Sequence, residues 1–334
     1  MRALFFEVEP WEAEYLKRKL SDCSVFCTQE KLSLKIVKQF SDITILGIFV
    51  NSQVTKQVLN LLPKLKLIVT LSTGFDHIDL VACKKTGVTV CNVPSYGENT
   101  VAEHAMALLL NISRKISESI ERTRKGDWNL QGLRGFDLQG KTIGIVGTGR
   151  IGKHVAEYAN SFRMKVIAWD KFPDKHWAKI QGVSHVSFAK LLAQSNVISL
   201  HLPYTKETHH IISMKNLSKI KKGCVLINTA RGGLIETKAL VIGLEKGIFS
   251  ALGLDVLEEE GIVKEDRTHI SRVYAHDANM KTVLADHVLA EQPSVYITPH
   301  NAFNSSEALK RILDTTIENV QAFEKGKPVN VVKE

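Results

Sequence analysis

The chain has 334 residues, of which 44% are hydrophobic and 24% are charged, a composition that indicates a globular protein and disfavours disordered and membrane classes. This length predicts two domains. The formal net charge of +9 comes from lysines and arginines that are scattered among acidic residues, which predicts solvated faces that attract an anionic substrate and argues against a nucleic-acid partner.

The length of the apolar runs and the spacing of the cysteines indicate the cellular compartment. No apolar run reaches the length of a membrane span, and the chain begins directly with the strand-like segment Arg2–Phe6, so we expect a cytoplasmic protein that does not enter a membrane. The cysteines lack paired C-x-x-C sets and histidine partners at zinc spacing. We therefore expect buried thiols in a reducing compartment and no metal site, the five residues being Cys23, Cys27, Cys83, Cys91 and Cys224.

Residues 1–98 alternate short apolar segments with helical segments, which is the pattern of a parallel α/β unit. The predicted strands are Ala3–Phe6, Ser24–Cys27, Thr44–Val50, Leu65–Leu71 and Thr89–Val93. The predicted helices between them are Glu12–Leu20, Leu32–Gln39, Thr55–Leu62 and Ile78–Lys85. No glycine fingerprint follows the first strand, so we do not expect a nucleotide site in this unit.

A single long helix is predicted from Asn99 to Lys125, with Gly126 ending it. Thr100 and Glu103 can form a capping box at its start. The first half is apolar nearly all round and the second half is charged. This pattern fits a domain spine or dimer arm, and equally a plain core helix with a solvated tail.

From residue 141 onward, strands alternate with helices, which predicts a second, doubly wound sheet. A charged and histidine-rich excursion, 261–292, interrupts the pattern before the last strand. After His300 a final helix follows, capped by Asn304 and Glu307 and ended by Gly326. The predicted strands are Thr142–Val146, Lys165–Trp169, Asn196–Leu200, Cys224–Asn228, Ala251–Asp255 and Val295–Thr298.

A dinucleotide fingerprint, G-x-G-x-x-G, joins the first strand of the second unit to a helix. Gly147 permits the tight turn, Gly149 lets the backbone approach a pyrophosphate, and Gly152 lets the helix pack closely on its strand. Asp170 ends the next strand, eighteen residues after Gly152, where a carboxylate accepts hydrogen bonds from the adenine ribose. Because this carboxylate would repel a 2′-phosphate, we expect NAD, although the nearby Lys171 and Lys175 leave NADP open.

Residues that directly follow the later strands include an arginine, a group of carboxylates and a histidine, and ligands bind at this edge of a doubly wound sheet. Arg231 can hold a small carboxylate bidentately and polarise the adjacent carbonyl. His300 can give a proton to that carbonyl as hydride arrives, so ketone reduction should weaken as pH rises and alcohol oxidation should show the opposite trend. Glu260 would orient the ring and stabilise its charged form. Alternatively, Arg231 is a surface ion-pair residue and His300 is structural.

Several segments resemble those of the NAD-dependent D-2-hydroxyacid dehydrogenases, in the order of that family and over most of the chain from residue 70. They are VPSYGENTVAEHAMALLL (93–110), LQGKTIGIVGTGRIG (138–152), HLPYTKETHHII (201–212), INTARGGLIET (227–237), GLDVLEEEG (253–261) and ITPHNAFN (297–304). The resemblance implies two Rossmann- or flavodoxin-like doubly wound parallel-sheet domains. A substrate domain, 1–98 plus 302–334, would receive an inserted NAD-binding Rossmann domain, 99–301. It further implies a homodimer formed largely through the cofactor domains.

The resemblance also implies a set of site residues. The catalytic set is Arg231, Glu260 and His300, with Glu258 and Glu259 as competitors for Glu260 if the register shifts. Domain closure would bring Arg231 and His300 against a substrate held by the loop at Ser72–Phe75 and exclude water. The implied substrate contacts are Ser72, Thr73, Gly74, Tyr96, Arg231, Phe303 and Phe49. The implied cofactor contacts are Gly147, Thr148, Gly149, Arg150, Ile151, Gly152, Asp170, Leu202, Pro203, Thr208, Thr229, Ala230 and Asp255.

Tyr96, Phe303 and Phe49 match aromatic positions that line a small apolar pocket in the D-lactate dehydrogenases of this family. We therefore expect interconversion of pyruvate and D-lactate. Larger acids such as 2-hydroxyisocaproate and phenyllactate remain alternatives, because an apolar pocket discriminates a methylene by only about 1–3 kcal/mol; 3-phosphoglycerate is a weaker one. An alternative of another class is an NAD(H)-sensing module like the corepressors that resemble these enzymes.

Overall fold

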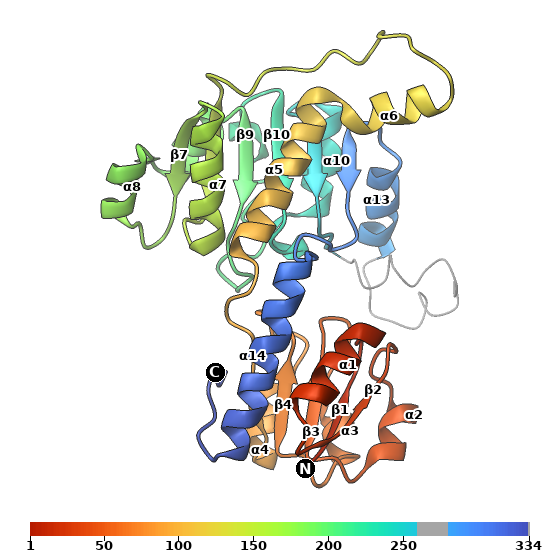
Figure 1. The fold of residues 1–334 in the computed structure, drawn as a ribbon. Helices are drawn as coiled ribbons and strands as arrows, with labels where there is room; N and C mark the ends of the chain where they lie inside the picture. Colours follow the sequence, from red (N-terminus) through yellow and green to blue (C-terminus); the bar gives the residue numbers. More distant parts are fainter. Residues whose placement is uncertain (259–279, 333–334) are drawn as a thin grey trace. The chain divides into compact units, whose positions relative to one another are not determined.

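A computed structural model describes residues 1–258 and 280–332 of the chain (Figure 1). The chain forms two compact units, one comprising Met1–Gly97 with Asn304–Glu334 and the other comprising Glu98–Phe303. The second unit is thus inserted into the first. The expected boundaries, 98/99 and 301/302, differ from these by one residue at the first crossing and by two at the second. None of the described helices combines the length and the apolar character that crossing a membrane requires.

The first unit has a parallel sheet with the strand order β2-β1-β3-β4-β5, the doubly wound order of the flavodoxin type. Its strands are β1 (Arg2–Phe5), β2 (Ser24–Cys27), β3 (Ile45–Ile48), β4 (Leu67–Thr70) and β5 (Thr89–Cys91). Its helices are α1 (Pro10–Lys19), α2 (Leu34–Val37), the 3-10 turn η1 (Lys38–Phe40), α3 (Lys56–Asn60), α4 (Leu80–Thr86) and α14 (Ser306–Glu324).

The N-cap of the final helix, α14, lies one residue later than predicted. Ser305, not Asn304, is its N-cap, and the Ser305 hydroxyl accepts a hydrogen bond from Ala308 N at 3.2 Å. An apolar stripe runs along one face of α14, where Ala308, Ile312 and Val320 are all nearly fully buried. Burial of this stripe within the first unit explains why the end of the chain returns to the domain in which it began.

The second unit has a parallel sheet with the order β12-β11-β10-β9-β6-β7-β8. This is the Rossmann order, with its topological switch point between β6 and β9. The strands are β6 (Thr142–Val146), β7 (Lys165–Trp169), β8 (Ser184–His185), β9 (Val197–Leu200), β10 (Cys224–Asn228), β11 (Phe249–Leu254) and β12 (Val295–Ile297). The helices include α5 (Glu98–Arg114), α6 (Ile116–Arg124), α7 (Arg150–Ser161), α8 (Lys175–Gln181), α9 (Phe188–Gln194), α10 (Thr237–Glu245) and α13 (Met280–Ala290), with 3-10 turns η2 (Leu217–Lys219) and η3 (Gly232–Leu234).

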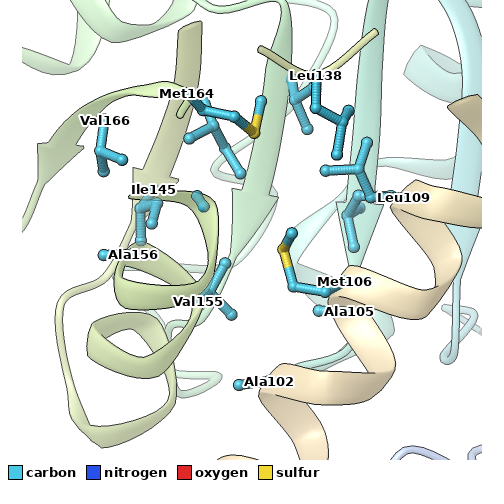
Figure 2. Packing of buried hydrophobic residues seen from close by; sticks show 14 of the residues in the cluster. Ala102, Ala105, Met106, Leu109, Leu138, Ile145, Val155, Ala156, Met164 and Val166 are labelled. Atoms are coloured by element: carbon cyan, nitrogen blue, oxygen red, sulfur yellow. The ribbon is translucent and has the colours of Figure 1, made fainter. Parts of the chain in front are cut away.

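Helices α5 and α7 pack side by side on one face of this sheet (Figure 2). Ala102, Ala105 and Met106 on α5 belong to the same buried cluster as Val155 and Ala156 on α7. Small residues on both helices let the two backbones approach each other closely. The start of α5, where the chain enters this unit, is therefore fixed against the helix that follows the glycine turn.

The single long helix that we expected is wrong, because the helix breaks at Lys115, which adopts a left-handed conformation with φ 54°. Ser113 O would accept from Ser117 N in a continuous helix, but it accepts instead from Phe136 N at 2.9 Å. Ser117 N donates to the side chain of Asn111 at 2.9 Å. A returning segment, distant in sequence, thus takes over a carbonyl of the helix and ends it. The predicted Thr100 cap is also wrong, because Thr100 lies inside the first turn of α5.

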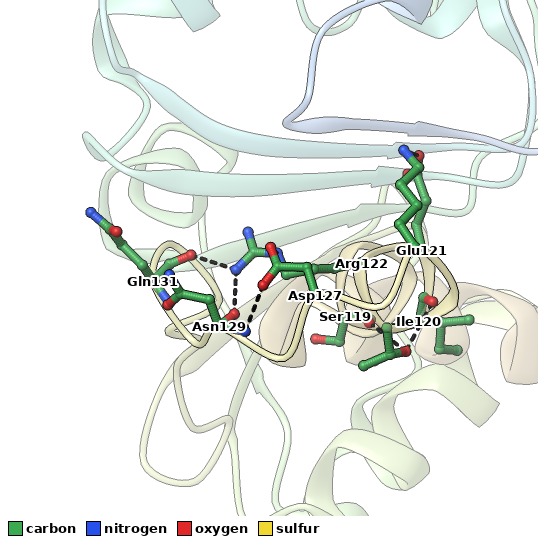
Figure 3. A network of polar contacts seen from close by, with 9 residues as sticks. Ser119, Ile120, Glu121, Arg122, Asp127, Asn129 and Gln131 are labelled. Atoms are coloured by element: carbon green, nitrogen blue, oxygen red, sulfur yellow. Dashed lines mark hydrogen bonds and ion pairs between the residues drawn. The ribbon is translucent and has the colours of Figure 1, made fainter.

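Helix α6 and the chain that follows it form a surface segment, which we call the arm (residues 116–136). The Arg122 guanidinium organises it by donating to the carbonyls of Asn129 at 2.6 Å and Gln131 at 2.7 Å (Figure 3). The side chains of Trp128 and Leu130, each next in sequence to one of these carbonyl residues, are 79% and 80% exposed. The arm therefore holds large apolar side chains in water by a network of polar contacts.

Candidate active site

The glycine turn between β6 and α7 has the geometry that the fingerprint predicts. Gly147 has φ +97°, and a Cβ placed on it would lie 2.6 Å from His201 O. A Cβ on Gly152 would lie 2.0 Å from Gly147 O. A Cβ on Gly149, in contrast, would meet nothing within 4 Å among the described residues. Two of the glycines are thus required by the chain itself, and the space beside the third is open to a ligand.

This difference predicts opposite phenotypes for two alanine variants. Gly152→Ala should lower stability by roughly 1–3 kcal/mol, because the new methyl collides with backbone. Gly149→Ala should leave the melting temperature nearly unchanged, because its φ of −70° suits alanine, yet weaken NADH binding about tenfold or more by occupying the space of the phosphates. Thermal melts and fluorescence titration with NADH measure the two effects. Equal losses of melting temperature in both variants would contradict this assignment.

Helix α7 begins at the turn, with Gly149 as its N-cap and no side chain capping its first N–H groups among the described residues. These N–H groups and the helix dipole favour a phosphate at this position. Asp170, which follows β7, closes the other side of the turn. Its Oδ2 accepts from Thr148 N at 2.6 Å and from Thr148 Oγ1 at 3.1 Å, and its Oδ1 accepts from Phe172 N at 2.8 Å. The predicted ribose carboxylate is therefore held against the glycine turn.

The segment after β9 lies at the switch point, beside Gly147. The Leu202 side chain and His201 O are the atoms that a Cβ on Gly147 would meet. Burial of the ring lowers the pKa of His201 to about 3, so this histidine is neutral, and its Nε2 pairs with Ser199 Oγ at 2.8 Å. The Thr208 hydroxyl donates to Pro203 O at 2.7 Å. Thr208 thus shapes the turn that contains the predicted cofactor contacts Leu202 and Pro203.

The segment after β10 carries Arg231. Asn228, fully buried at the end of the strand, donates to Arg231 O at 2.9 Å and accepts from Ala230 N at 3.0 Å. The Arg231 guanidinium donates to Ala230 O at 2.7 Å. Next to it, Thr229 Oγ1 is buried and has no hydrogen-bond partner among the described residues. A buried hydroxyl without a partner costs stability unless a ligand supplies one.

The segment after β12 carries His300 and is wrapped around Asp255, which follows β11 and is 1% exposed. Asp255 Oδ1 accepts from Asn301 N at 2.7 Å and from the Thr298 hydroxyl, and Oδ2 accepts from Ala302 N at 2.9 Å. His300 N donates to Asp255 O at 2.9 Å. His300 has φ +57°, a conformation that costs a non-glycine residue about 1–3 kcal/mol and that clusters at functional sites. The predicted contact between Asp255 and NAD stays a prediction; the structure adds that Asp255 positions the histidine.

Of the three candidate glutamates, Glu260 and Glu259 lie outside the described residues. Glu258 is described, and its Oε2 accepts from Thr237 N at 3.0 Å while its Oε1 pairs with His210 Nε2 at 2.5 Å. Burial raises the pKa of the Glu258 carboxyl, but the hydrogen bonds from Thr237 and His210 outweigh burial and lower it overall. Glu258 thus has structural partners on two neighbouring segments.

The predicted substrate residues Ser72, Thr73 and Gly74 follow β4 in the first unit and form one hydrogen-bonded turn. Ser72 Oγ donates to Gly74 O at 2.6 Å, and Thr73 Oγ1 donates to Val93 O at 2.8 Å. Phe49 follows β3 and Tyr96 follows β5, so both belong to the carboxyl edge of the same sheet. The other predicted substrate residues, Arg231 and Phe303, belong to the second unit.

Sequence patterns missed His104, which lies on α5 with its Nε2 3.0 Å from Thr298 Oγ1 and 3.5 Å from Asp255 Oδ1. Its place inside the matched segment 93–110 was the only signal, and nothing in that segment indicates a partner almost two hundred residues away.

Known proteins resemble the whole chain. Residues 106–302 match the family described as D-isomer specific 2-hydroxyacid dehydrogenase, NAD binding domain. The glycerate dehydrogenase of Methylorubrum extorquens is 38% identical over 278 residues, which are 81% of this chain and 80% of that protein. The pyruvate reductase of Chlamydomonas reinhardtii has a solved structure with a TM-score of 0.89 and 34% identity, and the match covers 98% of each chain. The D-lactate dehydrogenase from Aquifex aeolicus, solved with NAD and lactic acid, has a TM-score of 0.86 and 36% identity over 97% of this chain and 96% of that one.

Proposed function

The chain belongs to the family of D-isomer specific 2-hydroxyacid dehydrogenases, and from this premise we propose that it reduces pyruvate to D-lactate with NADH and catalyses the reverse reaction. The family membership makes it an NAD-dependent oxidoreductase that acts on a CH–OH group; the acid is our proposal. The observation that carries the proposal is the wrapping of segment 298–302 around Asp255, which holds His300 in a strained conformation at the carboxyl edge of the cofactor sheet.

The residues present fit NAD. The open space at Gly149 and the uncapped start of α7 suit a pyrophosphate, Asp170 suits a ribose diol, and Thr229 Oγ1 is a buried hydroxyl that a ligand would satisfy. Bound NADH supplies the hydride.

The remaining chemistry is assigned to side chains. Arg231 holds the substrate carboxylate bidentately and places a further N–H against the keto oxygen, which stabilises the charge that develops there. The His300 ring donates its proton to that oxygen and takes it back in the oxidation direction. We propose that Glu260 orients this ring, and that Ser72, Thr73, Gly74, Tyr96, Phe49 and Phe303 contact the substrate.

Similarity to a D-lactate dehydrogenase and to a pyruvate reductase supports the small keto acid. Similarity to a glycerate dehydrogenase, at a slightly higher identity, supports a hydroxylated acid such as hydroxypyruvate as the second candidate. The aromatic residues proposed for the side-chain pocket favour pyruvate, because an apolar pocket leaves a substrate hydroxyl without a hydrogen-bond partner. Larger keto acids are a third candidate.

The test is the decrease in NADH absorbance on mixing the protein with pyruvate, hydroxypyruvate, glyoxylate, 2-ketoisocaproate or phenylpyruvate, with a parallel series using NADPH. A kcat/KM highest for pyruvate, and higher with NADH than with NADPH, supports the proposal. A clear preference for another acid would identify that acid as the substrate in place of pyruvate. NADH binding without turnover of any 2-keto acid would overturn the proposed catalytic function and favour an NAD(H)-sensing role.

We also propose that the protein works in a reducing compartment such as the cytoplasm. The five cysteines are unpaired thiols, and Cys83, Cys91 and Cys224 are buried. Burial raises the pKa of the Cys91 thiol to about 11 and that of Cys224 to about 12, so neither is a reactive thiolate at neutral pH.

A second copy of the chain is the proposed partner of the arm. Exposed apolar side chains on one ordered segment are typical of an interface, and besides Trp128 and Leu130 the arm also exposes Ile116 and Ile120 on α6. The double variant W128D/L130D should therefore be a monomer where the unmodified protein is a dimer. Light scattering during gel filtration measures the mass. Val81→Asp, which changes a 56% exposed apolar residue in the first unit, is the matched control and should leave the dimer intact.

A further inference from the structure

His104 lies on α5 and is hydrogen-bonded toward the segment that carries His300. Its Nε2 is 3.0 Å from Thr298 Oγ1, and the Thr298 hydroxyl in turn donates to Asp255 Oδ1. Since a hydroxyl has one proton and gives it to the carboxylate here, it must accept from the ring. The order of donation is therefore His104 to Thr298 to Asp255, which requires the proton on Nε2 of His104.

Asp255 is the centre of this arrangement. The same carboxylate accepts from Asn301 N and Ala302 N, so Asp255 binds the backbone on the C-terminal side of His300 and the Thr298 side chain on its N-terminal side. The carboxylate is 1% exposed, and a carboxylate so deeply buried depends on each hydrogen bond and on nearby positive charge. The His104 ring, 3.5 Å from Oδ1, is the cation partner when it is protonated.

Helix α5 gives His104 a fixed position. Its neighbours Ala102, Ala105 and Met106 are buried in the cluster that α5 shares with α7 and the sheet. A rigid helix thus provides the outermost donor of the chain of hydrogen bonds, whereas the segment 298–302 has left-handed backbone at His300 and needs external support to hold it. The chain also enters this unit at Glu98, one end of α5, and leaves it at Phe303, just beyond Ala302.

We propose that His104 is a positioning residue for His300, acting through Thr298 and Asp255; this inference rests on the proposed dehydrogenase function. By donating to the Thr298 hydroxyl, His104 keeps the proton of that hydroxyl directed toward Asp255. The hydrogen bonds of Asp255 in turn fix the backbone from which the His300 ring projects. His104 does not itself contact the reacting atoms. A displacement of about 1 Å at a reacting group can cost 100-fold in rate, so a change in this network should appear in catalysis before it appears in folding.

The experiment uses two matched pairs of variants in the full chain. His104→Leu and Thr298→Val remove the hydrogen bonds at nearly constant volume, whereas His104→Gln and Thr298→Ser keep a donor or a hydroxyl at the same place. We expect kcat for keto-acid reduction to fall about 10- to 100-fold in His104→Leu and in Thr298→Val. In His104→Gln and in Thr298→Ser we expect kcat to stay within about threefold of the unmodified protein. KM for the keto acid and the Kd for NADH should change little, whereas the melting temperature should fall by a few degrees in His104→Leu and Thr298→Val, because the buried network around Asp255 loses a hydrogen bond.

The double variant H104L/T298V tests whether His104 and Thr298 act together through one network or independently of each other. If the two residues act through one chain of hydrogen bonds, the double variant should lose no more kcat than the more affected single variant. Multiplicative losses, or losses of melting temperature with kcat unchanged, would overturn the proposal and leave His104 a structural residue. If His104→Leu fails to fold, the Thr298 pair carries the test alone. Absence of turnover in the unmodified protein would overturn the proposed function itself, which distinguishes the two failures.

Discussion

Replacing His300 with asparagine is expected to lower kcat for keto-acid reduction about 100- to 10,000-fold while leaving NADH binding unchanged. Asparagine removes the proton donor but accepts the left-handed backbone that His300 adopts at φ +57°. The hydrogen bond from the backbone N–H of residue 300 to Asp255 O can therefore persist. Steady-state kinetics and a fluorescence titration with NADH measure the two quantities.

His176→Asn is the matched control, since His176 is an exposed histidine on α8 in the same unit. It should retain full activity. A His300→Asn protein with kcat within threefold of the unmodified protein would contradict the assignment of His300 as the proton donor. Loss of NADH binding in the same variant would instead show that the change has disturbed the cofactor site.

The pH dependence of kcat gives a second readout of the same residue. Reduction needs the charged ring and oxidation needs the neutral ring, so the rate of reduction should fall as pH rises and the rate of oxidation should rise. In His300→Asn both trends should disappear from the remaining activity. The Glu258 carboxyl has a pKa below that of an ordinary glutamate, because the effect of burial is outweighed by the hydrogen bonds that Thr237 and His210 form with it. Its protonation should therefore not produce the same profile.

Sequence reasoning worked where the structural cause is local. Gly147 and Gly152 could be interpreted from spacing alone because the turn and the close approach involve residues within one βα unit. The alternation of strands and helices likewise predicted both sheets. The two-residue strand β8 was missed, because a segment of that length has no periodicity to detect.

Features that depend on distant partners could not be predicted. The break at Lys115 follows from the hydrogen bond between Ser113 O and Phe136 N, and no helix propensity near Lys115 encodes it. The pairing of His104 with Thr298 joins residues on different elements of the fold. The insertion of one domain into the other came from resemblance to a family, since strand periodicity alone is silent on which unit receives the last helix.

Substituting glutamine for Arg231 is expected to lower kcat/KM for pyruvate about 1,000-fold, mostly through KM. Hydrogen bonds between two charged groups in a partly buried site are worth about 2–5 kcal/mol when one partner is removed, and each 1.4 kcal/mol is a factor of ten. Arg231→Lys keeps the charge but not the planar pair of donors, so we expect an intermediate loss of about 10- to 100-fold. The loop should keep its shape in both variants, because Asn228 binds the backbone of residues 230 and 231 and not the guanidinium.

Methyl pyruvate makes this test specific for the carboxylate. The ester keeps the ketone but lacks the negative charge, so the ratio of kcat/KM for pyruvate to that for methyl pyruvate reports how strongly the site binds the charge. We expect this ratio to collapse in Arg231→Gln, whereas Lys246→Gln, which removes an exposed cation at the end of α10, should leave it unchanged. If Arg231→Gln lowers both rates by the same factor, then Arg231 polarises the ketone and another group holds the carboxylate. Backbone N–H groups of the turn Ser72–Gly74 would then be the next candidates, because the hydroxyls of Ser72 and Thr73 already donate to carbonyls of the chain.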